Sequence, residues 1–406
     1  MPLSFSEVED ALKQLYPENR IAELVFKTHP LLALMNSRTD FYGRNMFVPI
    51  RTGKPQGRSH TFDDARTAEE GSIYDGFTLT RISDFGLAQI SGEAAEAAES
   101  EPARFIATLD AEMSGALSTL GDNMAMELYG NGGGSRGVIA AGGVTGDVIT
   151  LEDPESIVFF EVAQTIVSAD NDGTSGSLGA QAGAKIIAID EDEGTITVDD
   201  IANLDSPVAT DNLFGLGDRG LAVSGLGSWL PNVAPSGGDN HFGVDRSTQP
   251  SRLAGVRFDP GAVTIINALI AANARLRRSG GRVTHFFMNP ILVSTLEQSL
   301  EASKRVVDVM SPELNIGFKA IGVMLATGEV PILADPDCPV DRCYGLQLDT
   351  WTRASLAGAP RVFDGDGLKF LRTTGDSFEI RVLSRWQVYT TSPGYNINID
   401  MSGVTG

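Results

Sequence analysis

The longest regular pattern in the chain is an apolar stripe with helical spacing. Apolar residues recur every three or four positions between 105 and 128, namely at Phe105, Leu109, Met113, Leu117, Leu120, Met124 and Leu128. This spacing predicts one amphipathic helix over about 101–129, roughly 40 Å long at 1.5 Å per residue. Ser100 is the expected N-cap, and Pro102 suits the first turn. Gly130 stands where a left-handed C-terminal cap is expected.

Two runs rich in β-branched and aromatic residues precede this helix, at 43–62 and 76–90. A polar link, DDARTAEEGSIYD, separates them, so they predict a long hairpin after an acidic amphipathic helix at the N-terminus. Such a hairpin has little core of its own and is expected to project and to find partners elsewhere. The alternative is an ordinary hairpin at the edge of a compact sheet.

Segment 144–235 changes character, because short β runs alternate with acidic turns. It predicts a small inserted β domain, in which AKIIAIDEDEGTITVDD forms a hairpin with its turn at 190–194. The acids raise a calcium hypothesis, but a calcium loop in SADNDGTSG would need acids where Ser168 and Gly179 stand. A solvated acidic surface is therefore the better interpretation.

The remaining chain mixes helices and strands, so the predicted fold class is α+β. A helix is expected to begin at Asp259-Pro260, with its apolar side formed by Val263, Ile266, Ile270 and Leu276. VTHFFM predicts a buried strand, and Asn289-Pro290 begins a second helix. Further strands are expected at VPILA, RCYGLQL, LKFLRT and FEIRVLSRWQVYT.

Charge is placed unevenly along a chain with a formal net charge of −22. Segment 147–219 holds sixteen acids and two bases, whereas 38–58 holds five cations and one acid. So acidic a protein is a poor general binder of nucleic acid, and its basic stretch is a candidate contact for acidic surface on another copy. No export signal or membrane span is expected, and the two cysteines make no disulfide framework.

Several motifs match patterns found in enzymes but lack the structural context that those patterns require. Ser135 lies in a G-x-S-x-G pattern, but the pattern follows a helix, whereas a nucleophile elbow precedes one. GLGDRG at 215–220 lacks the following helix that a dinucleotide fingerprint requires. The four histidines are scattered, and the tightest candidate metal cluster, in the segment 335–343, is Asp335, Asp337, Cys338, Asp341 and Cys343. We therefore predict no enzyme and assign no catalytic, cofactor-binding or metal residue.

Four stretches together resemble the major capsid proteins of tailed bacteriophages, which share the Hong Kong ninety-seven capsid fold. They are TRISDFGLAQISGEA, ELYGNGGGSRGVI, FFMNPILVSTLEQSLEAS and VPILADPDCPVDRCYGLQLDTW, and their order also matches the family. The resemblance implies an N-terminal arm at 1–42, an extended loop at 43–98, a spine helix and peripheral domain at 99–143, an inserted β domain at 144–235, an axial domain at 236–350 and peripheral return strands at 351–406.

The resemblance also implies a function, that of a virion shell protein. Copies would form hexamers and pentamers of an icosahedral shell around double-stranded DNA, assembled in the host cytoplasm with a separate scaffolding protein and a portal. The candidate intersubunit residues are Arg44, Arg51, Lys54 and Arg58. In some family members a loop lysine forms an isopeptide bond with an asparagine; Lys54 lies in that region, and no motif identifies its partner. The alternatives are an encapsulin-like compartment and, in another class, a metal-binding hydrolase.

Overall fold

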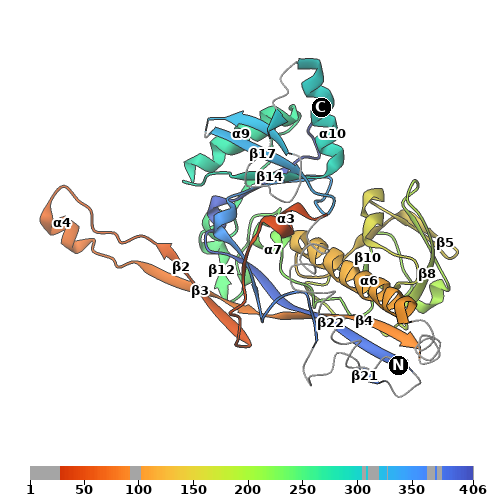
Figure 1. Ribbon diagram of the computed structural model, residues 1–406. Coiled ribbons are helices and arrows are strands. Elements are labelled where there is room, and N and C mark those ends of the chain that lie inside the picture. The colour runs from red at the N-terminus through yellow and green to blue at the C-terminus, as the bar shows by residue number, and fades with distance from the viewer. Residues whose placement is uncertain are drawn as a thin grey trace.

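The computed structural model describes residues 28–91, 102–303, 308–309, 320–326, 328–363, 371–372 and 377–405. Figure 1 shows a body of two sheets, a barrel on one side of it and a hairpin that projects from the opposite side. The fold class is α+β, as the sequence predicted. Within these residues no helix is long and apolar enough to cross a bilayer.

The centre of the body is a six-stranded sheet built around β22. Its strands are β1 (Asn36–Arg38), β4 (Ile82–Ser91), β19 (Trp351–Ser355), β20 (Arg361–Val362), β21 (Leu371–Arg372) and β22 (Ser377–Thr390). β4 and β22 pair antiparallel along ten residues, from Ile82 opposite Trp386 to Ser91 opposite Ser377. β22 contains the predicted strand FEIRVLSRWQVYT, whereas most of LKFLRT lies outside the described residues.

The spine helix α6 (Pro102–Tyr129) packs on β4 and β22 of this sheet. The five stripe residues whose side chains are described, from Met113 to Leu128, are at most 3% exposed, which confirms the predicted buried face. The expected cap at Ser100 lies outside the described residues. The expected left-handed cap at Gly130 is wrong, because the first positive φ after the helix belongs to Gly132, at 91°.

The hairpin consists of β2 (Asn45–Gly53) and β3 (Ile73–Thr80), and α4 (Phe62–Thr67) lies at its tip. Run 76–90 is not one strand of this hairpin, as the sequence suggested. It breaks at Arg81, whose Nη1 donates hydrogen bonds to the carbonyls of Phe41 (2.6 Å) and Gly43 (3.0 Å). These bonds hold the chain where it leaves the hairpin as β3 and enters the central sheet as β4.

The acidic segment forms a closed six-stranded barrel. Its strands are β5 (Gly137–Thr145), β6 (Val148–Leu151), β7 (Thr165–Ala169), β8 (Ala184–Asp190), β9 (Thr195–Val198) and β10 (Asn212–Gly215), with short 3₁₀ turns η1 (Pro154–Phe159) and η2 (Ile201–Asn203). β8 and β9 form the predicted hairpin, with Asp190 opposite Thr195. The barrel has its own apolar core. The chain after it returns to the body, where α7 (Leu226–Trp229) is buried in the main core.

The second sheet has seven strands in the order β13-β23-β18-β14-β17-β16-β15. They are β13 (Val256–Phe258), β14 (His285–Met288), β15 (Asp308–Val309), β16 (Ala320–Leu325), β17 (Gly328–Ala334), β18 (Arg342–Leu346) and β23 (Ile397–Asp400). β14, β17 and β18 confirm three predicted strands, and the helices α9 (Ile265–Arg278) and α10 (Pro290–Ser303) accompany this sheet. The last strand, β23, thus lies here and not beside the spine helix.

The start and the buried face of α9 differ from the prediction. The backbone N–H of Gly261 bonds to Asp259 Oδ1 at 2.8 Å with a φ of +66° at Gly261, and this turn delays the helix until Ile265. The buried face consequently contains Ile265 and Leu269, while Ile270 is 46% exposed. The start of α10 is as predicted, because Asn289 Oδ1 accepts a bond from the N–H of Ile291 at 3.0 Å.

The other short elements join these layers. They are α3 (Pro30–Leu34), α8 (Pro250–Leu253), β11 (Asn240–His241), β12 (Val244–Asp245), η3 (Arg246–Thr248), η4 (Leu348–Thr350) and η5 (Pro393–Tyr395).

Candidate functional site

The root of the hairpin is anchored in the main core. Val48 is 6% exposed, and Phe77 and Leu79 are fully buried. The ring of Phe77 meets that of Trp229 edge to face, with centroids 4.8 Å apart. Because aromatic pairs in this geometry add to the free energy of simple burial, the root is held firmly.

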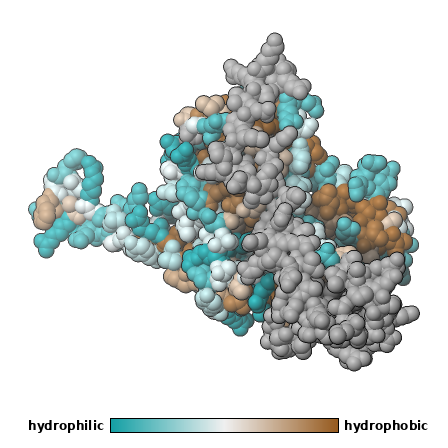
Figure 2. Space-filling view, viewed as in Figure 1, coloured by the Kyte–Doolittle hydropathy of each residue, from teal (hydrophilic) through white to brown (hydrophobic). Residues whose placement is uncertain are grey.

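The outer part of the hairpin lacks such support. β2 and β3 form a two-stranded sheet, so beyond the root neither strand pairs with a second strand within the described residues. Phe47 is 65% exposed, Ile73 63%, Tyr74 67% and Phe62, in α4 at the tip, 80%. Figure 2 shows that the rest of the projecting surface is mostly hydrophilic. Open strand edges and exposed aromatics surrounded by polar residues are typical of a surface that binds another chain.

The four sequence-predicted contact residues are all exposed on this hairpin or at its root. The structure brings Arg51 and Lys54 together, because both line a cavity of about 200 Å³ beside Arg252 of α8. Arg44 and Arg58 do not line it. Arg252 also belongs to this basic surface, and the sequence analysis missed it because about 200 residues separate it from Lys54. Its Nη1 donates to the Thr52 carbonyl at 2.8 Å.

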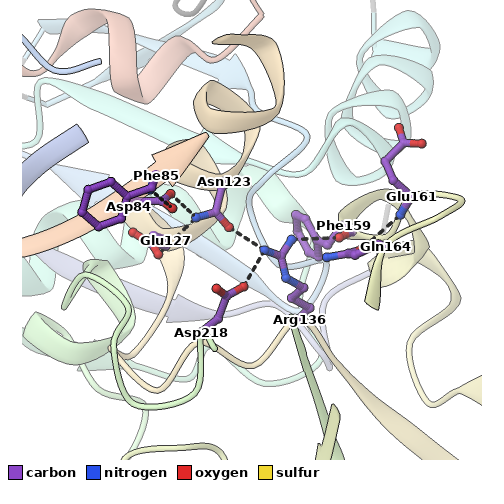
Figure 3. A network of polar contacts seen from close by, with 9 residues as sticks. All are labelled: Asp84, Phe85, Asn123, Glu127, Arg136, Phe159, Glu161, Gln164 and Asp218. Carbon is purple, nitrogen blue, oxygen red and sulfur yellow. Dashed lines mark hydrogen bonds and ion pairs between the residues drawn. The ribbon is translucent and has the colours of Figure 1, made fainter. Parts of the chain in front are cut away.

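A partly buried polar network joins the spine helix, the barrel and β4 (Figure 3). Arg136 Nη2 donates to Asn123 Oδ1 of α6 at 2.7 Å and to Asp218 Oδ2 at 2.9 Å, and its Nη1 donates to the Phe159 carbonyl of the barrel at 3.1 Å. Asn123 Nδ2 in turn donates to Asp84 Oδ2 of β4 at 2.7 Å. One arginine and one asparagine therefore fix the barrel on the spine.

Glu127 lies one helical turn beyond Asn123 in the same network, which Figure 3 shows. Asn123 Nδ2 approaches its Oε1 at 3.3 Å, while its Oε2 is buried with no partner among the described residues. Burial, with the nearby negative charge of Asp84, raises the pKa of Glu127 to about 8. At neutral pH the carboxyl is therefore mostly protonated, which lowers the cost of burying it.

A second polar cluster centres on His29, the residue before α3. Its Nδ1 lies 2.6 Å from Asp337 Oδ2, and its Nε2 lies 3.0 Å from Asp122 Oδ1 of the spine helix. Burial alone would lower the pKa of His29, but hydrogen bonds and charge attraction from the two aspartates raise it to about 10. The imidazolium thus links α3, the spine helix and the loop after β17.

The candidate metal cluster is structural. Asp335 accepts hydrogen bonds from Tyr129 Oη at 2.8 Å and from the Leu31 N–H at 3.2 Å, and burial raises its pKa above the usual range. Cys338 is buried, and its Sγ contacts the Phe287 carbonyl at 3.7 Å. Across the part of the chain that the structure describes, no three His, Cys, Asp or Glu side chains are placed to hold a metal ion.

The other candidate motifs have structural roles as well. Ser135 Oγ donates to Asn212 Oδ1 of the barrel at 2.7 Å, in a turn from the spine helix into β5. His241 packs edge to face on Trp229, with centroids 4.6 Å apart, and burial lowers its pKa. The structure does not bring the four histidines together: His60 lies outside the hairpin strands, and His285 lies in β14.

No family model and no curated protein matches the chain at the level of sequence. Solved structures do match. A capsid chain of cyanophage A-1(L) is 13% identical, with a TM-score of 0.54 and 95% of each chain covered. The Gordonia phage Cozz structure is 12% identical over 100% of this chain and 96% of that one, with a TM-score of 0.44. The encapsulin of Synechococcus elongatus PCC 7942 is 11% identical over 98% and 95%, with a TM-score of 0.44.

Proposed function

We propose that this chain, which has the capsid fold of tailed phages, is a major capsid protein. Its copies assemble through repeated contacts into hexamers and pentamers of a closed icosahedral shell. The shell encloses double-stranded DNA without reading its sequence. Function then lies in many interfaces, each burying about 1,000 Å² or more, and in no single reacting residue.

The observation that supports this proposal best is the projecting hairpin. It is anchored at its root by Phe77 and Leu79, and it carries exposed Phe47 on β2 and exposed Phe62 in α4 at its tip. A two-stranded hairpin that projects with little core of its own is only marginally stable, and copies related by symmetry can cover one another's hairpins. The cyanophage structure, whose fold matches over nearly the whole chain, is that of a capsid.

Other parts of the proposal follow from this role. We propose the six-part division predicted from the sequence with three changes: β4 belongs to the central sheet, the inserted domain is the closed barrel that begins at β5 and ends at β10, and β23 belongs to the seven-stranded sheet. We place the barrel on the outer surface of the shell. A separate scaffolding protein and a portal are expected partners, and the mature location is the virion. None of these roles calls for a cofactor or a membrane.

The test is to express the chain alone and with its neighbouring genes, and to examine both products by light scattering and negative-stain microscopy. Uniform shells or capsomer rings are expected. A persistent monomer or dimer under both conditions would overturn the proposal. Nuclease treatment followed by extraction then identifies the contents, since protected DNA supports a phage head and protein cargo without DNA points to an encapsulin-like compartment.

The role of the hairpin is tested by charge reversal at three of its exposed cations, Arg51, Lys54 and Arg58. The triple variant is expected to keep the circular dichroism of the unaltered subunit, because none of these side chains is buried. It should nevertheless fail to form shells. Normal shells from the triple variant would contradict this role.

A further inference from the structure

Two adjoining cavities beside the hairpin form a strongly basic surface, which we call the basic cleft. The first, of about 200 Å³, is lined by Arg51, Lys54 and Arg252. The second, of about 620 Å³, shares Lys54 and Arg252 and adds Arg278 from the end of α9. Tyr395 lines both, and no described carboxylate lines either of them.

The four cations of the basic cleft come from β2 and the residue that follows it, from α8 and from α9, and all are exposed. Among the described residues none of them forms an ion pair, and the hydrogen bonds of Arg252 go to the neutral oxygens of Thr52 and Gln249. Gathering four like charges raises the free energy of the subunit unless anions lie close by. In a chain with a net charge of −22, such a cleft is therefore suited to an anionic partner.

The largest supply of anions on the same chain is the barrel. Segment 147–219 has sixteen acids against two bases, and within the described residues the barrel carboxylates from Asp147 to Asp211 form no ion pair. Most of these carboxylates are exposed, including all four in the turn 190–193. The barrel surface and the basic cleft are thus complementary in charge.

Their positions prevent them from meeting within one subunit. The hairpin, whose cations line the basic cleft, leaves one side of the molecule, and the barrel lies on the opposite side (Figure 1). Two complementary patches on opposite sides of one subunit produce head-to-tail contacts, which close into rings when the rotation between copies allows it. A second copy is therefore the partner that fits best.

We propose that the basic cleft binds carboxylate side chains of the barrel of an adjacent copy of this chain. The inference rests on the proposed shell function and specifies one of its contacts. The attraction acts mainly on the rate and the register of association, because exposed ion pairs contribute little individually. Two other anions compete for this role: the acids around the hairpin tip, such as Asp63 and Glu69, and nucleic-acid phosphate.

The first test reverses two cleft charges in the full chain, as Arg252→Glu with Arg278→Glu. The control is the single variant Arg277→Glu. Arg277 lies beside Arg278 in the last turn of α9, is exposed and does not line the cleft. The double variant is expected to need about tenfold more protein for half-assembly, whereas the control assembles like the unaltered chain. Equal assembly of all three would overturn the inference and leave the shell function standing. If the unaltered chain itself fails to assemble, the shell function fails.

The second test identifies the anion. Equal amounts of ¹⁵N-labelled and unlabelled chain are mixed, assembled and treated with a carbodiimide, which joins an amine to a carboxylate in direct contact. Mass spectrometry then locates the partner of Lys54, the lysine of the cleft. Mixed-isotope links from Lys54 to a carboxylate in 147–211 are expected. Links only to acids of the hairpin tip, or no link between copies, would overturn the barrel assignment. The assignment would also be overturned if nucleic acid protected Lys54 from this coupling.

Discussion

Replacing His29 by glutamine should remove a specific pH dependence from the stability of the subunit. Glutamine can still donate hydrogen bonds toward Asp337 and Asp122, which lie 2.6 and 3.0 Å from the imidazole. It cannot carry the positive charge. The variant therefore separates the charge at this junction from the hydrogen bonds and from the packing.

The sign and the magnitude of this pH dependence follow from the linkage between proton binding and folding. The pKa of His29 is about 10 in the folded chain and 6.5 for the unperturbed group, so the folded state holds an extra proton between these values. This contribution to stability is complete below pH 6.5 and is lost as the pH rises through about 10. Between these two pKa values the free energy of unfolding changes by about −1.4 kcal/mol per pH unit. Since Asp122 is 62% exposed and screened, we expect a loss of about 2 kcal/mol between pH 7.5 and 9.5.

Urea unfolding followed by tryptophan fluorescence at pH 7.5, 8.5 and 9.5 measures this loss. Trp229, Trp351 and Trp386 belong to the same core cluster as Leu31, two residues from His29, so their signal reports on this region. The unaltered chain should lose stability over this range more steeply than His29→Gln. His60→Gln, on an exposed histidine, should keep the full slope. Parallel curves for the unaltered chain and His29→Gln would refute the reasoning.

Three further predictions concern the spine helix and its neighbours. Leu117→Ala, at a fully buried position, should lower the free energy of unfolding by roughly 2–5 kcal/mol in the same urea assay. Gly225→Ala would place a Cβ 2.2 Å from the Glu127 carbonyl oxygen and 2.3 Å from that of Leu128, so we expect a loss of about 2 kcal/mol or more, and an unchanged midpoint would contradict the close packing. Glu127→Gln should make the decline in stability between pH 5 and 8 shallower, because the folded carboxyl, with a pKa of about 8, holds a proton that the unfolded one releases near 4.5. Identical pH profiles for the variant and the unaltered chain would show that burial does not raise this pKa.

Local patterns predicted the elements whose boundaries are set locally. The stripe from Met113 to Leu128 predicted α6 because its period is that of a helix and the whole face packs on one sheet. The acidic turn at 190–194 predicted the β8–β9 hairpin because the two strands that it joins are adjacent in the sequence. Run 76–90 was misread as one strand because nothing local marks Arg81 as a break. That break depends on carbonyls some forty residues earlier in the chain.

The candidate site likewise contains residues that the local sequence singles out and residues that only the fold brings together. A dense cluster of cations between 38 and 58 was enough to single out Arg51 and Lys54, which do share a cavity. Arg252 and Arg278 gave no signal, because each joins the basic cleft only through the fold. Asp335 and Asp337 drew attention as metal ligands by their spacing. Their actual partners, Tyr129 and His29, lie about 200 and 300 residues away in the sequence.

The contrast between buried and exposed ionisable groups bears on how such a chain works. Inside the subunit, two cations have matched partners: His29 lies between two aspartates, and Arg136 bonds to Asp218 and Asn123. These contacts hold the spine, the barrel and the central sheet as one frame. On the surface, by contrast, the cations of the cleft and the acids of the barrel stay apart within one subunit. A rigid frame that keeps complementary charges on opposite sides cannot neutralise them by folding further, so association with other copies is the remaining way to lower that electrostatic energy.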